Sequence, residues 1–126
     1  MTLPSSGHDT VALIGTDRSA ETLAWNPHTK FTGIALRHLV TGSDTGGVLS
    51  LHHVRIDPGC SIGDHTHPGM VEIHEVIARD GTCTVGIKEI RYIPGKLGVM
   101  PADTVHRVVA GAKGMPLLAT FSPALL

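Results

Sequence analysis

Residues 59–81 read GCSIGDHTHPGMVEIHEVIARDG, and this stretch holds three of the nine histidines of a 126-residue chain. His65 and His67 are two positions apart, so on an extended strand their side chains point to the same face, with roots about 7 Å apart. The Pro-Gly pair that follows offers a tight turn, after which the chain can run back antiparallel and bring Glu72 beside the two imidazoles. The stretch therefore predicts two strands that share a cluster of nitrogen and carboxylate ligands.

A fourth ligand has to come from a strand later in the chain, and His106 in the segment PADTVHRVV is the natural candidate. Three histidines and one glutamate favour one divalent transition metal ion, which could be iron, manganese, nickel, zinc, cobalt or copper. An octahedral ion held by four side chains keeps two open positions, where a substrate, water or dioxygen can bind. The alternative is a barrel that binds no metal and in which these residues are only hydrogen-bonded polar groups.

The rest of the chain is divided by fifteen glycines and eight prolines into short segments of alternating apolar character. Such segments are typical of β-strands, and almost none has helical periodicity. So many short strands in one small domain predict an all-β sandwich or barrel that closes off its own edges. The expected strands lie in nine segments: 33–42, 48–56, 61–67, 71–78, 82–87, 89–93, 96–100, 104–110 and 116–122.

Composition narrows the function classes. A length of 126 residues fits one compact domain, and an aromatic content of 3% means that the core has to be aliphatic. A formal net charge of -1 without a cluster of Lys and Arg argues against a nucleic-acid partner. Without a bilayer-length apolar run or a signal-peptide pattern, we expect a cytoplasmic protein with no membrane partner. Cys60 and Cys83 form no CxxC pair and are expected to stay reduced.

The opening stretch resembles the first conserved motif of the cupin superfamily. That motif runs glycine, five residues, HxH, three or four residues, glutamate, six residues and glycine, and the chain matches it from Gly59 through Glu72. The closing glycine of the motif falls on Arg79. We therefore expect the hairpin turn to be made by Asp80 and Gly81 instead.

The segment around His106 resembles the second cupin motif, which runs glycine, five residues, PxG, two residues, histidine, three residues and asparagine. Gly95, Pro101 and His106 match it, whereas Asp103 and Ala110 replace the second glycine and the asparagine. Neither replaced residue carries a ligand atom in the family, so the resemblance still implies the metal site.

The resemblance covers about residues 31–122. It implies a single-domain cupin β-barrel of jelly-roll type, with the metal held inside near one mouth of the barrel. We accordingly divide the chain into an N-terminal arm with the first edge strand (1–30) and the barrel domain (31–126).

Four of the other histidines lie on the predicted strands that surround the site. His74 shares the strand parity of Glu72 and should face the same cavity. The four motif residues already supply the protein ligands, so we predict that His74 stays off the metal and acts as general acid or base. The alternative is a core histidine paired with a backbone carbonyl. Only one of His52 and His53 can face inward, and the sequence does not say which. Three histidines are expected to be surface or structural residues: His8, His28 and His38.

The resemblance leaves two classes of function open. One is a metal-dependent enzyme, of oxygenase, isomerase or lyase type, acting on a small polar molecule inside the barrel. The other is a non-catalytic cupin that binds or senses a small molecule or a metal, because a fold does not fix a reaction. Val71 and Ile73 alternate with Glu72, so they should form an outward apolar strip that needs cover. We therefore expect a homodimer.

Overall fold

The computed structural model describes residues 10–126, and most ordered segments in that range are β-strands. The only helices there are η1 (Ala20–Thr22) and α1 (Gly42–Thr45), neither long and apolar enough to cross a membrane. The strands are β1 (Thr10–Ala12), β2 (Asp17–Ser19), β3 (Asn26–Pro27), β4 (Ile34–Val40), β5 (Ser50–Ile56), β6 (Ser61–His65), β7 (Val71–Val76), β8 (Gly81–Val85), β9 (Lys88–Tyr92), β10 (Leu97–Met100), β11 (His106–Ala110) and β12 (Met115–Ser122).

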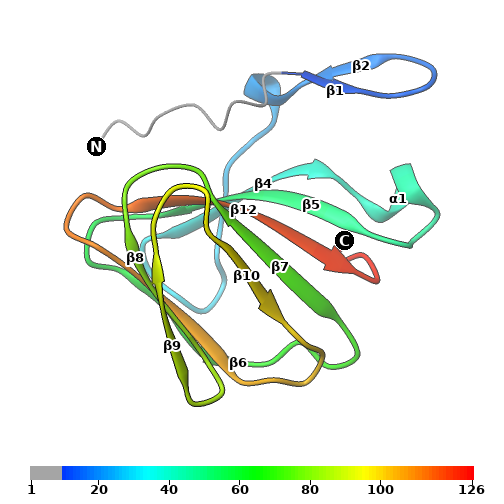
Figure 1. Ribbon diagram of the computed structural model, residues 1–126. Helices are drawn as coiled ribbons and strands as arrows, with labels where there is room; N and C mark the ends of the chain where they lie inside the picture. The colour runs from blue at the N-terminus through cyan, green and yellow to red at the C-terminus, as the bar shows by residue number, and fades with distance from the viewer. Residues whose placement is uncertain (1–9) are drawn as a thin grey trace.

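Two antiparallel sheets face each other and enclose the core (Figure 1). One sheet has six strands in the order β10-β7-β12-β5-β4-β3, and the other has four in the order β6-β11-β8-β9. The side chains buried between them are mainly aliphatic, with Tyr92 and Phe121 as the aromatic members. This arrangement confirms the prediction of an all-β barrel, and Ala20, Leu39 and Leu118 form a second, smaller buried cluster beside the main core.

Each of the nine segments predicted as strands overlaps one, from β4 to β12. β3 forms the edge of the six-stranded sheet, and the N-terminal arm before it is more ordered than expected, because β1 and β2 pair as a small hairpin. Arg18 ties the hairpin to the barrel with two hydrogen bonds of 2.9 Å to the Asp44 carboxylate and one of 2.8 Å to the Leu39 carbonyl. Residues 1–9, including His8, lie outside the described residues. The domain boundary at residue 30 stays a prediction.

The turn between β7 and β8 differs from the expected one. Arg79 itself adopts a positive φ of 62°, at the motif position where other cupins are expected to have glycine. Gly81 is instead the first residue of β8, where a Cβ would overlap the carbonyl oxygen of Val109 on β11. The prediction that Asp80 and Gly81 make the turn is therefore wrong, since Gly81 is needed for close packing of two strands. Asp103 also has a positive φ of 66°, which aspartate tolerates better than most residues.

Candidate metal centre

Four side chains from three neighbouring segments meet inside the barrel. His65 ends β6, His67 lies in the loop after it, Glu72 lies on β7, and His106 begins β11 directly opposite His65. One ligand atom from each of the four lies within 4.8 Å of all the others. The structure thus brings together the four predicted ligands in a group that could hold a metal ion. That they bind one stays a prediction.

Hydrogen bonds to backbone carbonyls orient two of these rings. Nδ1 of His65 lies 2.7 Å from the Gly63 carbonyl oxygen, and Nδ1 of His106 lies 3.0 Å from the Thr104 carbonyl oxygen. A carbonyl can only accept, so each Nδ1 carries a proton, and a neutral ring then presents a bare Nε2 to the site. Such backbone contacts commonly fix the tautomer of a metal-binding histidine.

The donor set fits a cation. Nε2 of His106 lies 2.9 Å and Nε2 of His67 lies 3.4 Å from Oε1 of Glu72. A bare nitrogen lone pair facing a carboxylate oxygen at 2.9 Å is repulsive unless a positive charge, a proton or a metal ion, lies between them. Burial lowers the pKa of both His65 and His67, which favours the neutral rings that metal coordination requires.

Glu72 is a buried carboxylate with only 5% of its surface exposed. Burial by itself would raise the pKa of its carboxyl group, but the charge of His74 and the hydrogen bond that His74 donates outweigh burial. The pKa of Glu72 is therefore well below its usual range. The side chain is an anion held inside the barrel by histidines.

The sequence places His74 beside this carboxylate, and the structure shows both of its ring nitrogens engaged. Nε2 lies 2.8 Å from Oε2 of Glu72, and Nδ1 lies 3.0 Å from the hydroxyl of Tyr92. Burial opposes protonation of His74, but the charge of Glu72 and the hydrogen bonds that the ring donates to Cys83 and Glu72 raise its pKa to about 9. His74 lies on the cavity wall and outside the four-residue ligand group. Its catalytic role stays a prediction.

Tyr92 completes this buried chain of polar groups. The ring is fully buried, and burial raises the pKa of its hydroxyl far above its ordinary value. A Cβ at Gly98 on β10 would overlap the Tyr92 hydroxyl, so only glycine leaves room for it at that position. Glu72, His74 and Tyr92 are thus held in line by the packing of β7, β9 and β10.

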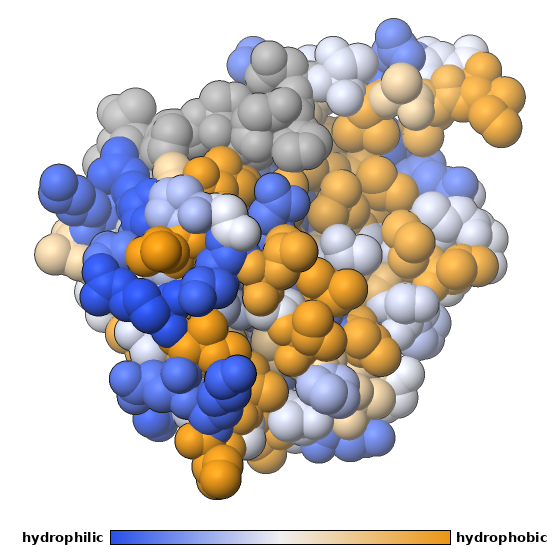
Figure 2. Space-filling view, viewed as in Figure 1, coloured by the Kyte–Doolittle hydropathy of each residue, from blue (hydrophilic) through white to orange (hydrophobic). Residues whose placement is uncertain are grey.

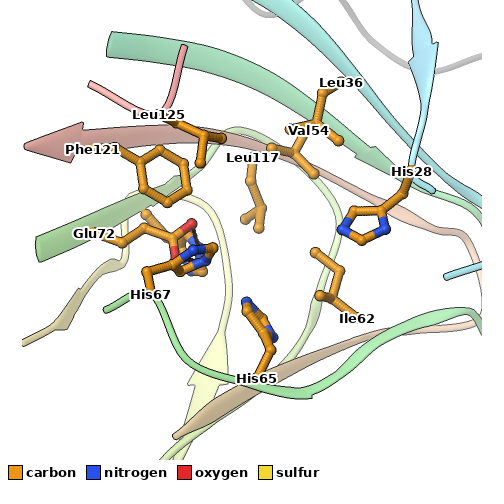
Figure 3. A pocket seen from close by; sticks show the side chains of 11 residues that line it. His28, Leu36, Val54, Ile62, His65, His67, Glu72, Leu117, Phe121 and Leu125 are labelled. Carbon is orange, nitrogen blue, oxygen red and sulfur yellow. Dashed lines mark hydrogen bonds and ion pairs between the residues drawn. The ribbon is translucent and has the colours of Figure 1, made fainter. Parts of the chain in front are cut away.

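A cavity of about 70 Å³ opens beside the ligand group (Figure 3). Apart from His65, His67, Glu72, His74 and one further histidine, its wall is apolar, and it contains no Lys or Arg among the described residues. A water molecule needs roughly 10–15 Å³ by this measure, so the cavity suits a molecule of a few heavy atoms. The apolar lining residues are Leu36, Val54, Ile62, Leu117, Phe121 and Leu125.

The further histidine of the wall is His28, which was expected to be a surface or structural residue. It lies in the loop after β3, and its ring points into the cavity (Figure 3). Its Nδ1 accepts hydrogen bonds from the backbone N–H groups of Lys30 and Phe31, at 3.0 and 3.2 Å. Burial, with the charge of Lys30, lowers the pKa of His28. No pattern in the sequence points to this residue, because it lies outside both motifs and on no regular strand.

His52 and His53 divide as strand alternation requires. His52 points inward, where Nε2 is 2.8 Å from the Ser50 hydroxyl and Nδ1 is 2.8 Å from Nδ1 of His38. His53 points outward and packs against the ring of Trp25 at 4.9 Å. His52 is absent from the residues that line the cavity, so its inward side chain is part of the core beside the site.

Comparison with known proteins gives one sequence relative. No model of a known protein family matches the chain. The oxaloacetate decarboxylase of Ectopseudomonas mendocina (strain ymp) is 31% identical over 85 residues, which are 60% of this chain and 25% of that protein. The chain thus spans about a quarter of the length of the curated relative that it matches.

Solved structures share the architecture. The KdgF structure from Halomonas sp. has a TM-score of 0.69 at 23% identity and covers 79% of this chain and 86% of that chain. A predicted oxalate decarboxylase from Thermotoga maritima has a TM-score of 0.76 at 17% identity, and the match covers 82% of this chain and 96% of that chain. An RmlC-like cupin from Shewanella frigidimarina has a TM-score of 0.76 at 18% identity, covering 94% and 96%. At these identities the likeness concerns the fold alone, and the chain has the same β-barrel fold as these structures.

Proposed function

We propose that the protein is a metal-dependent lyase that removes CO2 from a small oxo acid inside the barrel. The observation that carries the proposal is the pairing of the His65, His67, Glu72 and His106 group with an apolar cavity that has no Lys or Arg in its described wall. The sequence relative is an oxaloacetate decarboxylase and one structural neighbour is a predicted oxalate decarboxylase, and both names refer to the same class of reaction.

The apolar wall suits the loss of CO2. A divalent transition metal, when held by the four ligands, would supply a Lewis acid that polarises the oxo group of the substrate. That group can take up the electron pair of the broken C–C bond when the departing carboxylate is on the carbon next to the oxo carbon. A carboxylate that reaches the region of Val54 and Leu117 loses hydration without gaining a cationic partner. The neutral CO2 formed from it has no such cost, so the cavity favours the product side of the bond cleavage.

The polar residues around Glu72 have two tasks in this proposal. His74 and Tyr92 fix the Glu72 carboxylate through Oε2, which leaves Oε1 facing His67 and His106. His74 also lines the cavity, and the bond cleavage leaves a carbon that needs one proton. We propose that His74 delivers that proton, which is the acid–base role predicted for it.

The experiment measures CO2 release from small oxo acids by protein reconstituted in turn with Fe, Mn, Ni, Co, Cu and Zn. We expect release with at least one metal and none with the His65→Ala variant, compared with the same metal free in buffer as a control. Protein that binds an oxo acid but releases no CO2 with any of the metals would refute the lyase. That result would support the alternative, a cupin that binds or senses a small molecule without turnover.

A homodimer is part of the proposal. Val71, Ile73, Leu97 and Val99 form an apolar patch on the outer face of β7 and β10, with 40%, 39%, 62% and 56% of their surfaces exposed. Val99 pairs directly with Ile73, so the patch is continuous across the two strands, and Figure 2 shows apolar side chains gathered over this face. A patch of this kind commonly marks an interface, and we propose that a second copy covers it.

The proposed compartment is the cytoplasm. Both cysteines, Cys60 and Cys83, are free thiols. Reduced thiols accord with a reducing compartment.

A further inference from the structure

We propose that His28 is a substrate-binding residue, whose Nε2–H donates a hydrogen bond to an oxygen at the end of the oxo acid farthest from the ligand group. This inference rests on the proposed function, since it assigns the second polar contact of the same substrate. Neither cupin motif includes the residue.

The backbone fixes the tautomer of the ring. Two N–H groups, of Lys30 and Phe31, point at Nδ1 from 3.0 and 3.2 Å, so Nδ1 has to be the acceptor. A neutral imidazole carries a single proton, and here that proton is on Nε2. The lowered pKa of His28 keeps the ring neutral at ordinary pH. His28 is therefore a fixed donor and not a cation.

The loop also fixes the position of the ring. The backbone N–H of His28 donates to the Ile34 carbonyl at 2.8 Å, and the ring packs on Phe31 at 5.0 Å between centroids. In Figure 3 the ring enters the cavity on the side opposite Glu72 and His67. Within residues 10–126 no hydrogen-bond partner of Nε2 is found, so this donor is available to a bound molecule.

The two polar ends define the class of molecule that the cavity accepts. One end carries the oxygens that bind at the ligand group, the middle is a short aliphatic segment packed against Ile62 and Leu117, and the other end carries an acceptor oxygen for His28. A long acyl chain exceeds the volume of about 70 Å³. A phosphorylated molecule would find no Lys or Arg in the described wall. The molecules that meet both the volume limit and the charge limit are short oxo acids with a second oxygen function.

Two isosteric acids test this assignment. Hydroxypyruvate and 2-oxobutyrate have the same oxo-acid head and differ by a hydroxyl in place of a methyl group at the far end. Calorimetry on the metal-loaded protein gives the ratio of their dissociation constants. The informative variant is His28→Asn, because the asparagine carbonyl can still accept from the N–H groups of Lys30 and Phe31, while the side chain is too short to reach the cavity.

We expect His28→Asn to reduce the preference for hydroxypyruvate over 2-oxobutyrate by about fivefold to tenfold, the effect of one lost hydrogen bond in a desolvated site. An unchanged ratio overturns the role of His28 while leaving the proposed reaction intact. If the wild-type protein binds neither acid, the substrate class itself is wrong, and this inference fails with it.

Nitrogen NMR of the His28 ring gives a readout that needs neither metal nor substrate. We expect the Nε2–H tautomer at neutral pH in the wild-type protein. The Nδ1–H tautomer would overturn the inference.

Discussion

The metal-free protein should lose stability as the pH rises from about 6 to about 10, and His74 is the reason. The pKa of His74 is raised from 6.5 to about 9 in the folded protein, because Glu72 lies 2.8 Å away. A raised pKa contributes stability that is fully present below the unfolded value of about 6.5 and is lost as the pH rises through about 9. The difference of about 2.5 units corresponds to about 3 kcal/mol of unfolding free energy.

The assay is urea unfolding in a chelator at several pH values, for the wild type and for His74→Gln. Between about pH 6 and about pH 10, the unfolding free energy of the wild type should fall by about 3 kcal/mol more than that of the variant. His52→Gln is the matched control, because burial lowers the pKa of His52 to about 4, so its contribution changes on the acid side of pH 6.5. If the unfolding free energies of the wild type and His74→Gln fall equally as the pH rises, the reasoning is refuted. If His74→Gln does not fold, an NMR titration of the wild-type ring decides, since a pKa near 6.5 gives the same refutation.

Three further outcomes follow from the same geometry. Elemental analysis should find one equivalent of metal in the wild type and in His74→Ala but none in His65→Ala; loss from both variants would make His74 a ligand. Val71→Lys should shift light scattering from dimer to the 13.2 kDa monomer without unfolding the barrel, and a monomeric wild type would contradict the dimer. Gly98→Ala should displace the Tyr92 hydroxyl and cost about 1–3 kcal/mol in thermal unfolding, whereas an unchanged stability would show that the chain of polar groups has slack.

The strands could be predicted because their signal is local. Alternation of apolar and polar residues in β7 appears as alternation of exposed and buried positions, with Glu72 and His74 inside and Val71 and Ile73 outside. The β1–β2 hairpin could not be predicted in the same way. Its strands have three residues each, and it is fastened by Arg18 to Asp44, a contact between residues 26 positions apart.

The turn at Arg79 shows how a family pattern can mislead. The first cupin motif led to the expectation that a glycine would adopt the left-handed backbone conformation in this turn, and the nearest glycine was Gly81. The structure instead places the positive φ on Arg79, because Gly81 is needed within β8, where any side chain would overlap the Val109 carbonyl oxygen. Packing between β8 and β11 therefore decides the position of the turn, and no local signal reports that packing.

The grouping of His65, His67, Glu72 and His106 could be predicted from spacing, but the contacts that support this group could not. His74 was assigned to the cavity by parity alone, and its link to Tyr92 depends on β9 and β10, which approach β7 only in the folded sheets. His28 lies on no regular strand at all. Its role comes from two backbone N–H groups that fix the proton on the cavity side of the ring.

The two oxygens of Glu72 explain how one carboxylate can serve both a ligand group and a buried ion pair. Oε2 is hydrogen-bonded to His74, whose other ring nitrogen contacts the Tyr92 hydroxyl, while Oε1 faces His67 and His106. The first contact needs no metal, so the carboxylate is already fixed and ionised when a metal arrives. A cation that joins Oε1 then relieves the repulsion between that oxygen and the bare imidazole nitrogens, without moving the Oε2 contact. The barrel should therefore fold before it binds metal, unlike small domains whose folding depends on their ion.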